Sequence, residues 1–225
     1  MMKTKTKSQC DRCGQCCLQG GPALHTQDLE LIRQGRLSFA DLVTVRRGEL
    51  ALPPLGSEAE PVAAEFIKLQ GHGGSWSCRF FAKQGAAGAC QIYQYRPLAC
   101  RVLECSSPEA LLTITGKHLL SRFDCMDEQE PLLPLIREHE ERCSCPELAT
   151  VREQWADEQQ RSEILAAIQE LVDLDLQYRC AAARHFALPV ERELFYFGRP
   201  LFQLLAATLG VSPLQEGERI ILQQA

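Results

Sequence analysis

The stretch Cys10-Asp11-Arg12-Cys13-Gly14-Gln15-Cys16-Cys17 places four cysteines within eight residues near the start of the chain. Cysteines separated by two residues can turn back on one metal ion, because a tight turn brings both sulfur atoms to the same side. Gly14 supplies the backbone freedom that such a turn often needs. The spacing serves three of the thiols, whereas Cys17 points elsewhere because neighbouring side chains diverge. Cys17 then either joins a second centre or is simply buried, and the stretch needs ligands from elsewhere in the chain.

A second group of cysteines follows a spacer of 60 residues. Eight thiols in two such groups fit two tetrahedral four-sulfur sites, or one site with a redox pair left over. The competing interpretation is reduced, buried cysteine acting as a small hydrophobic residue. We predict a metal site instead. Its candidate ligands are Cys10, Cys13, Cys16, Cys17, Cys78, Cys90, Cys100 and Cys105.

The cysteine motifs resemble those of a known family. They are CxxCGxCC at Cys10–Cys17, C-x-F-F at Cys78–Phe81 and C-x-I-Y-x-x-R-P-x-x-C-R at Cys90–Arg101. This combination is similar to the bacterial CxxCxxCC (YkgJ-type) cysteine-cluster family, which is described as chelating zinc or iron. The resemblance covers about residues 10–105 and implies that the first seven candidate cysteines bind metal, with Cys105 the weaker match. Flagellin lysine-N-methylases carry the same kind of cluster, which keeps an enzymatic function open.

Ligation by sulfur alone favours zinc or an iron–sulfur centre. A bacterial ferredoxin motif needs a fourth cysteine three residues after the third, followed by proline. Here Cys17 follows at once and Leu18 comes next, so a ferredoxin-type cluster is not implied. A 4Fe-4S cluster with three local cysteines and one remote cysteine stays open beside structural zinc. Arg96 and Arg101 flank Cys100, where a guanidinium would offset the negative charge of thiolates. A role of Arg96 in capping a loop explains the presence of this arginine equally well.

Charge and composition narrow the class of protein. The formal net charge of −5 argues against a dedicated nucleic-acid binder. The sequence contains no apolar run of about 18 residues, so we expect no membrane span. The lysines near the N-terminus are not followed by the apolar stretch of a secretory signal. We therefore expect a cytoplasmic protein, in which clustered cysteines indicate metal rather than disulfides.

The chain changes in composition near Cys145. Residues 146–225 hold 7 Lys and Arg against 12 Asp and Glu, whereas residues 1–145 are balanced and hold eleven of the twelve cysteines. We predict an α-rich fold with irregular cysteine-rich loops. A metal-organised module would span residues 8–145, and an acidic helical region would span 146–225, packing on the module or binding a protein partner.

Local patterns predict several elements. Ser38 and Asp41 form a capping box that would begin a helix ending at Gly48. Further helices are predicted at 26–32, at about 200–209, and over a stretch of 35 to 40 residues from Pro146 that is continuous or broken. Residues 64–69 are expected to form a short strand, and residues 78–105 loops and turns.

The remaining cysteines are Cys125, Cys143, Cys145 and Cys180. The C-x-C pair of Cys143 and Cys145 would bind metal with Cys125, or be unrelated to metal, and Cys180 is predicted to lie in the core. The favoured function is a metal-binding protein with a cysteine-ligated zinc or iron centre. The alternatives are an iron–sulfur enzyme related to the lysine methylases and a zinc-structured interaction module.

Overall fold

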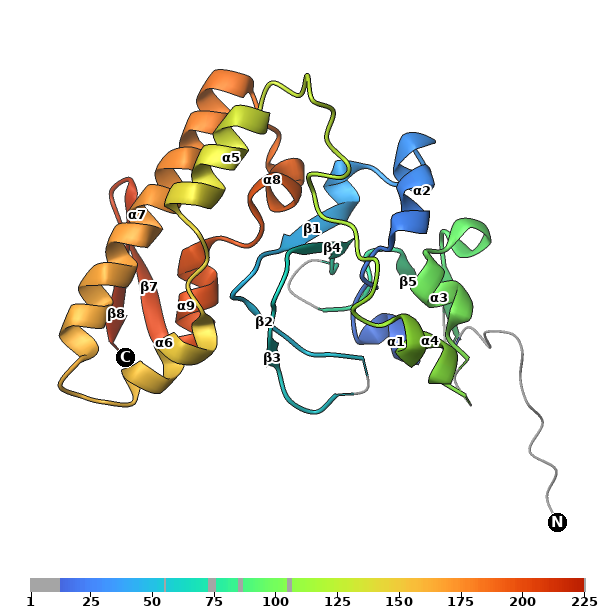
Figure 1. The fold of residues 1–225 in the computed structure, drawn as a ribbon, viewed down its shortest axis with the longest axis horizontal. Helices are drawn as coiled ribbons and strands as arrows, with labels where there is room; N and C mark the ends of the chain where they lie inside the picture. The colour runs from blue at the N-terminus through green and yellow to red at the C-terminus, as the bar shows by residue number, and fades with distance from the viewer. Residues whose placement is uncertain (1–12, 55, 73–75, 85–86, 105–106, 225) are drawn as a thin grey trace, which may run out of the picture. The chain divides into compact units, whose positions relative to one another are not determined.

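The computed structural model describes residues 13–54, 56–72, 76–84, 87–104 and 107–224. The chain forms two compact units (Figure 1). Unit 1 consists of residues 1–43 and 66–125, and unit 2 consists of residues 44–65 and 126–225. Helices account for 45% of the structure and strands for 18%, so the predicted α-rich class is confirmed in part. No helix within the described ranges is long and apolar enough to cross a membrane.

Unit 1 is built from short elements. Its helical segments are α1 (Gln15–Leu18), η1 (Thr26–Asp28), α2 (Leu29–Arg33), η2 (Phe39–Asp41), η3 (Tyr93–Tyr95), α3 (Leu98–Val102) and α4 (Glu109–Ile114). Its strands are β4 (Phe66–Leu69), β5 (Phe81–Gln84) and β6 (Ala87–Cys90), and β4 pairs with β1 (Leu42–Val45), which begins in this unit. The predicted helix at 26–32 and the predicted strand at 64–69 are both confirmed. Residues 78–105 hold β5, β6 and α3 as well as the predicted turns.

One predicted helix is wrong. The capping box forms as expected, since the Ser38 backbone amide donates to the Asp41 carboxylate at 2.9 Å and the Ser38 side chain accepts from the Asp41 amide. The helical turn stops after η2, however, and the chain continues as β1, in which all four residues are buried. Two valines and a threonine prefer the extended conformation, and here burial as a strand outweighs the helix-starting signal.

Unit 2 is dominated by longer helices. They are α5 (Leu133–Arg142), α6 (Leu148–Trp155), α7 (Arg161–Phe186), α8 (Val190–Phe197) and α9 (Leu201–Leu209). Its strands are β2 (Leu50–Ala51) with β3 (Glu60–Pro61), and β7 (Val211–Glu216) with β8 (Arg219–Gln224), each an antiparallel pair. The long helical stretch predicted from Pro146 is broken into α6 and α7, and α9 ends at Gly210 as predicted. The β7–β8 hairpin was not predicted.

The helices of unit 2 pack around one apolar cluster. Leu148, Val172 and Leu205 are at its centre, and β8 contributes Leu222. Figure 1 shows α5 lying alongside α7, the longest helix. Gln169 on α7 covers the edge of β8, because its side-chain amide donates to the Ile220 carbonyl and accepts from the Leu222 amide, both at 2.8 Å. The apolar packing and these hydrogen bonds fix the positions of the helices of unit 2, which carry its buried polar side chains.

Candidate metal centre

The first cysteine motif forms a turn followed by one turn of helix. Gly14 has φ 81°, a left-handed conformation, and precedes α1, which carries Cys16 and Cys17. A Cβ atom at Gly14 would lie 2.4 Å from the ring of Phe81, so only glycine permits this close approach. The predicted need for backbone freedom at Gly14 is therefore confirmed. Cys13 lies before the helix and is exposed.

The second motif is held against the first by a backbone hydrogen bond. The Cys78 amide donates to the Cys17 carbonyl at 2.6 Å. Cys90 ends β6 and pairs with Phe81 across the β5–β6 hairpin, so Cys78 and Cys90 come from the same hairpin region. The motifs on either side of the long spacer thus meet in unit 1.

Cys100 is placed by helix α3. The buried carboxylate of Asp28 accepts a hydrogen bond from the Leu98 amide at 2.8 Å, where α3 begins, and another from the His25 amide at 3.0 Å. These bonds satisfy a helix N-terminal donor that would otherwise lack a partner. Asp28 therefore fixes the start of the helix on which Cys100 lies two residues later.

The thiols of five cysteines lie close enough to change one another's pKa. A hydrogen bond with Cys17 lowers the pKa of Cys16 to about 6 and raises that of Cys17, to which burial, Cys78 and Cys100 contribute as well. Burial raises the pKa of Cys100 to about 12, and the neighbouring Cys78, Cys16 and Cys90 raise it further. Burial also raises the pKa of Cys78, with Cys90 and Cys16 acting in the same direction. Cys16, Cys17, Cys78, Cys90 and Cys100 therefore form one group, which we call the thiol cluster.

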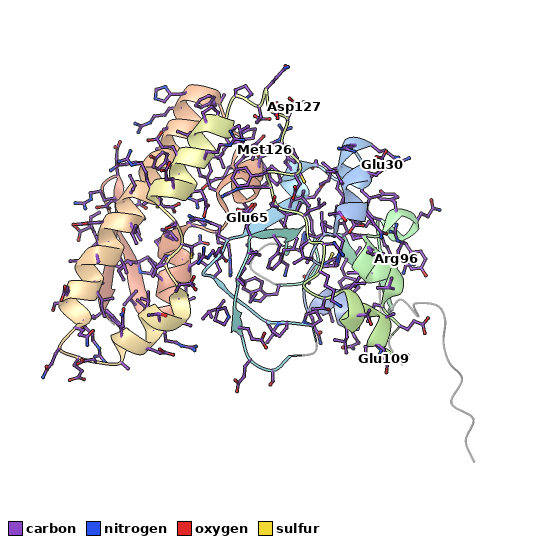
Figure 2. The ribbon with its side chains drawn as sticks, viewed as in Figure 1. Glu30, Glu65, Arg96, Glu109, Met126 and Asp127 are labelled. Carbon is purple, nitrogen blue, oxygen red and sulfur yellow. The ribbon has the colours of Figure 1, made fainter. Side chains whose placement is uncertain are left out.

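A guanidinium group faces this thiol cluster. Arg96 precedes α3 (Figure 2), and its guanidinium lies 3.8 Å from the ring centre of Tyr93. Its charge lowers the pKa of both Cys16 and Cys100, less strongly than the causes given above. The Arg96 Nε atom is buried and has no hydrogen-bond partner among the described residues. Of the two arginines that flank Cys100, Arg96 therefore acts on the thiols of the cluster, whereas the side chain of Arg101 is exposed.

The donor set suits a thiophilic metal. Four or five sulfur atoms beside a positive charge match the ligands and charge balance of a zinc or iron centre. A hollow of about 430 Å³ opens beside the cluster and is lined by Cys90, Tyr93 and Tyr95, with Gln91 and Gln94. Of the eight predicted ligands, the structure brings together five and leaves Cys13 exposed. Cys10 and Cys105 lie outside the described residues.

Unit 2 holds a separate group of potential ligands. One donor atom from each of His139, Cys143 and Asp175 lies within 4.8 Å of the others, and all three residues are buried. His139 Nε2 donates to Asp175 Oδ1 at 2.8 Å, since a carboxylate can only accept. Burial alone would raise the pKa of Asp175, but the bond from His139 and the charge of Arg179 hold it at about 2. Burial lowers the pKa of His139, which favours the neutral form of its ring.

Sequence reasoning missed His139 and Asp175. The four-residue spacing of His139 and Cys143 was a usable signal, because residues so spaced lie on one helical face. Asp175 could be found only from the packing of α7 on α5. Cys180 on α7 is exposed, so its predicted core position is wrong. Cys125 donates to the Ser121 carbonyl at 3.6 Å.

The comparisons with known proteins agree with the position of the thiol cluster. Residues 9–116 match the model of the CxxCxxCC family, described as "Putative zinc- or iron-chelating domain". No curated protein and no solved structure matches the chain. The match covers both cysteine motifs and ends before unit 2 resumes at residue 126. The chain therefore contains, over residues 9–116, a domain of the CxxCxxCC family.

Proposed function

We propose that this protein binds zinc or iron through a single sulfur-ligated centre in unit 1. The observation that carries the proposal is the convergence of the two cysteine motifs into the thiol cluster, with the Cys78 amide bonded to the Cys17 carbonyl. Residues separated by a long spacer do not gather five thiols merely to fill a core. Joint binding of one metal ion or iron–sulfur cluster accounts for their convergence.

Four cysteines are the proposed ligands: Cys16, Cys78, Cys90 and Cys100. Cys16 is preferred over Cys17 because the hydrogen bond between the two lowers the pKa of Cys16 and makes it the thiolate. Cys17 then keeps its proton and donates to the Cys16 sulfur, as donors around metal thiolates commonly do. Four thiolates around a divalent ion leave an excess negative charge, which the Arg96 guanidinium offsets.

The proposed centre also organises the fold of unit 1. Its ligands come from α1, from the β5–β6 hairpin region and from α3, and α1 and α3 are only 4 and 5 residues long. Helices this short are not stable without tertiary contacts. Metal binding would supply those contacts, so that the free energy of binding becomes free energy of folding.

A reducing compartment is part of the proposal. Ten described cysteines are free thiols, and the centre requires them unoxidised. This supports the cytoplasm as the location of the protein. The acidic helices of unit 2 remain our candidate for binding a protein partner.

The test is anaerobic purification followed by elemental analysis and an absorption spectrum. We expect zinc in a colourless protein, or iron in a brown protein whose visible absorption bleaches on reduction. Cys100→Ser should lose this metal, whereas Cys180→Ser, which changes an exposed cysteine of unit 2, should retain it. Protein that is free of zinc and iron would overturn the proposal, as would a Cys100→Ser variant with undiminished metal content.

A further inference from the structure

The strongest unassigned feature of the molecule is the buried group of His139, Cys143 and Asp175. We propose that these three side chains form a second metal site, for a zinc ion, inside unit 2. The site lies outside the family domain at 9–116 and shares no residue with the thiol cluster. Its ligands are the nitrogen, sulfur and oxygen donors that zinc binds in proteins.

The distances suit one ion. The three donor atoms lie within 4.8 Å of one another. Donors bound to zinc at about 2.0–2.3 Å lie roughly 3.3–3.8 Å apart in a tetrahedron, so side-chain movements of less than about 1 Å bring them into place. His139 and Cys143 face the site from α5 and the residue after it, and Asp175 faces it from α7. An ion here would link the two helices.

The orientation of the histidine ring shows which nitrogen would bind the ion. His139 is fully buried, and its Nε2 atom lies 2.8 Å from Asp175 Oδ1. Nδ1 lies on the other side of the ring, so a ligand set that includes Asp175 uses Nε2. The ion would take the place of the proton between Nε2 and Asp175, and this proton would move to Nδ1, which has no hydrogen-bond partner among the described residues.

The charges around the group favour a divalent cation. Arg46 pairs with Glu140, and Arg179 pairs with both Asp175 and Glu193. Two guanidinium groups and three carboxylates leave the network with one excess negative charge. A zinc ion that displaces the proton of the Cys143 thiol to solvent brings the total to zero. The bond between zinc and sulfur forms as the sulfur–hydrogen bond breaks, with no change of oxidation state.

The competing interpretation is a hydrogen-bonded network without metal. In that case the Asp175 carboxylate only accepts hydrogen bonds, from His139 at 2.8 Å, from Arg179 at 2.9 Å and from the Leu201 amide at 3.0 Å. The two interpretations differ at Cys143, because the thiol of Cys143 takes no part in the hydrogen-bonded network. Its thiol donates weakly to the Leu171 carbonyl at 3.4 Å. Cys143 is therefore the residue whose replacement separates them.

The first experiment counts zinc in the full-length protein by elemental analysis. Cys143→Ser should bind one zinc ion fewer per chain than the wild type, and Cys145→Ser is the matched control. Cys145 is a buried member of the same C-x-C pair but lies outside the three-residue group, so its replacement should leave the count unchanged. Equal zinc counts in folded Cys143→Ser and wild-type protein would overturn the proposal.

A second measurement needs no variant. X-ray absorption at the zinc edge of the zinc-loaded wild-type chain should show a histidine nitrogen in the coordination shell. The proposed centre of unit 1 has sulfur ligands only, so the nitrogen reports unit 2 alone. Cys100→Ser should keep this nitrogen signal while losing the metal of unit 1. A shell of sulfur only, or zinc absent altogether, would overturn the second site whether or not the unit 1 centre exists.

Discussion

The two units hold their reactive groups on supports of very different length. In unit 1 the thiol cluster lies on helices of 4 and 5 residues and on a hairpin with strands of four residues. In unit 2 the buried His139 and Asp175 lie on helices of 10 and 26 residues that pack on a common apolar cluster. Long packed helices position side chains by themselves, whereas single helical turns do not. If both proposed sites exist, metal would be structural in unit 1 and an addition to an already packed fold in unit 2.

Removing metal is the strongest way to break this comparison. We expect a chelator to unfold α1, α3 and the β5–β6 hairpin, while α7 and α9 stay folded on their apolar cluster. Hydrogen exchange followed peptide by peptide in the full chain measures both units at once. Equal loss of protection in the two units, or none in either, would contradict the contrast.

The next largest effect is expected from Arg179→Met. Arg179 is almost fully buried and pairs with Asp175 at 2.9 Å and Glu193 at 2.7 Å. Removing one partner of a buried ion pair leaves an uncompensated charge and costs about 3–5 kcal/mol. Denaturant unfolding followed by the fluorescence of Trp155, with Trp76 of unit 1 replaced by Phe, should show this loss for unit 2. Metal bound to the thiol cluster should be unchanged, and its loss would mean that the units are not independent in this respect.

A feature can be predicted from the sequence when the contacts that determine it join residues close together in the chain. The capping box of Ser38 and Asp41 is local and was predicted, but the strand that follows was not, because its burial is decided by β4. The pairing of the two cysteine motifs spans a long spacer and was still predictable, since thiols in such spacing have few other uses. The hydrogen bond between Cys16 and Cys17, which lowers the pKa of Cys16 and raises that of Cys17, could not be read from the sequence.

The buried group of unit 2 was beyond sequence reasoning for a related reason. Asp175 looks like one of many acidic residues on α7, and only its packing makes it the partner of His139. A run of acidic residues such as Glu138, Glu140 and Glu141 usually marks a solvated helical face. Glu138 and Glu141 are exposed, but Glu140 pairs with the buried Arg46. The function of a carboxylate is decided here by the neighbouring element and not by its own segment.

Asp28→Ala sharpens the comparison within unit 1. The buried carboxylate holds the Leu98 amide at the start of α3, and hydrogen bonds to charged groups are worth about 1.5–3 kcal/mol. We expect this loss to appear as weaker metal binding, because Cys100 lies on α3. Competition with a chromophoric chelator measures the affinity. Asp124→Ala is the matched control, since it removes a carboxylate of the same unit that accepts from the Ser121 amide at 2.8 Å and belongs to no part of the thiol cluster; equal losses in both variants would contradict the role of Asp28.

Gly14→Ala is expected to have the smallest effect and tests how the first motif meets the second. A left-handed residue with a Cβ atom costs about 1–2 kcal/mol, and the ring of Phe81 must also move. The variant should fold in unit 2 as the wild type does and bind the metal of unit 1 more weakly. Gly35→Ala carries a similar φ of 67° but has open space around it, so it isolates the backbone strain from the contact with Phe81. An equal loss in the free energy of unfolding of unit 1 for both substitutions would show that strain alone is responsible, whereas a larger loss for Gly14→Ala assigns the difference to the packing of Phe81 on the cysteine turn.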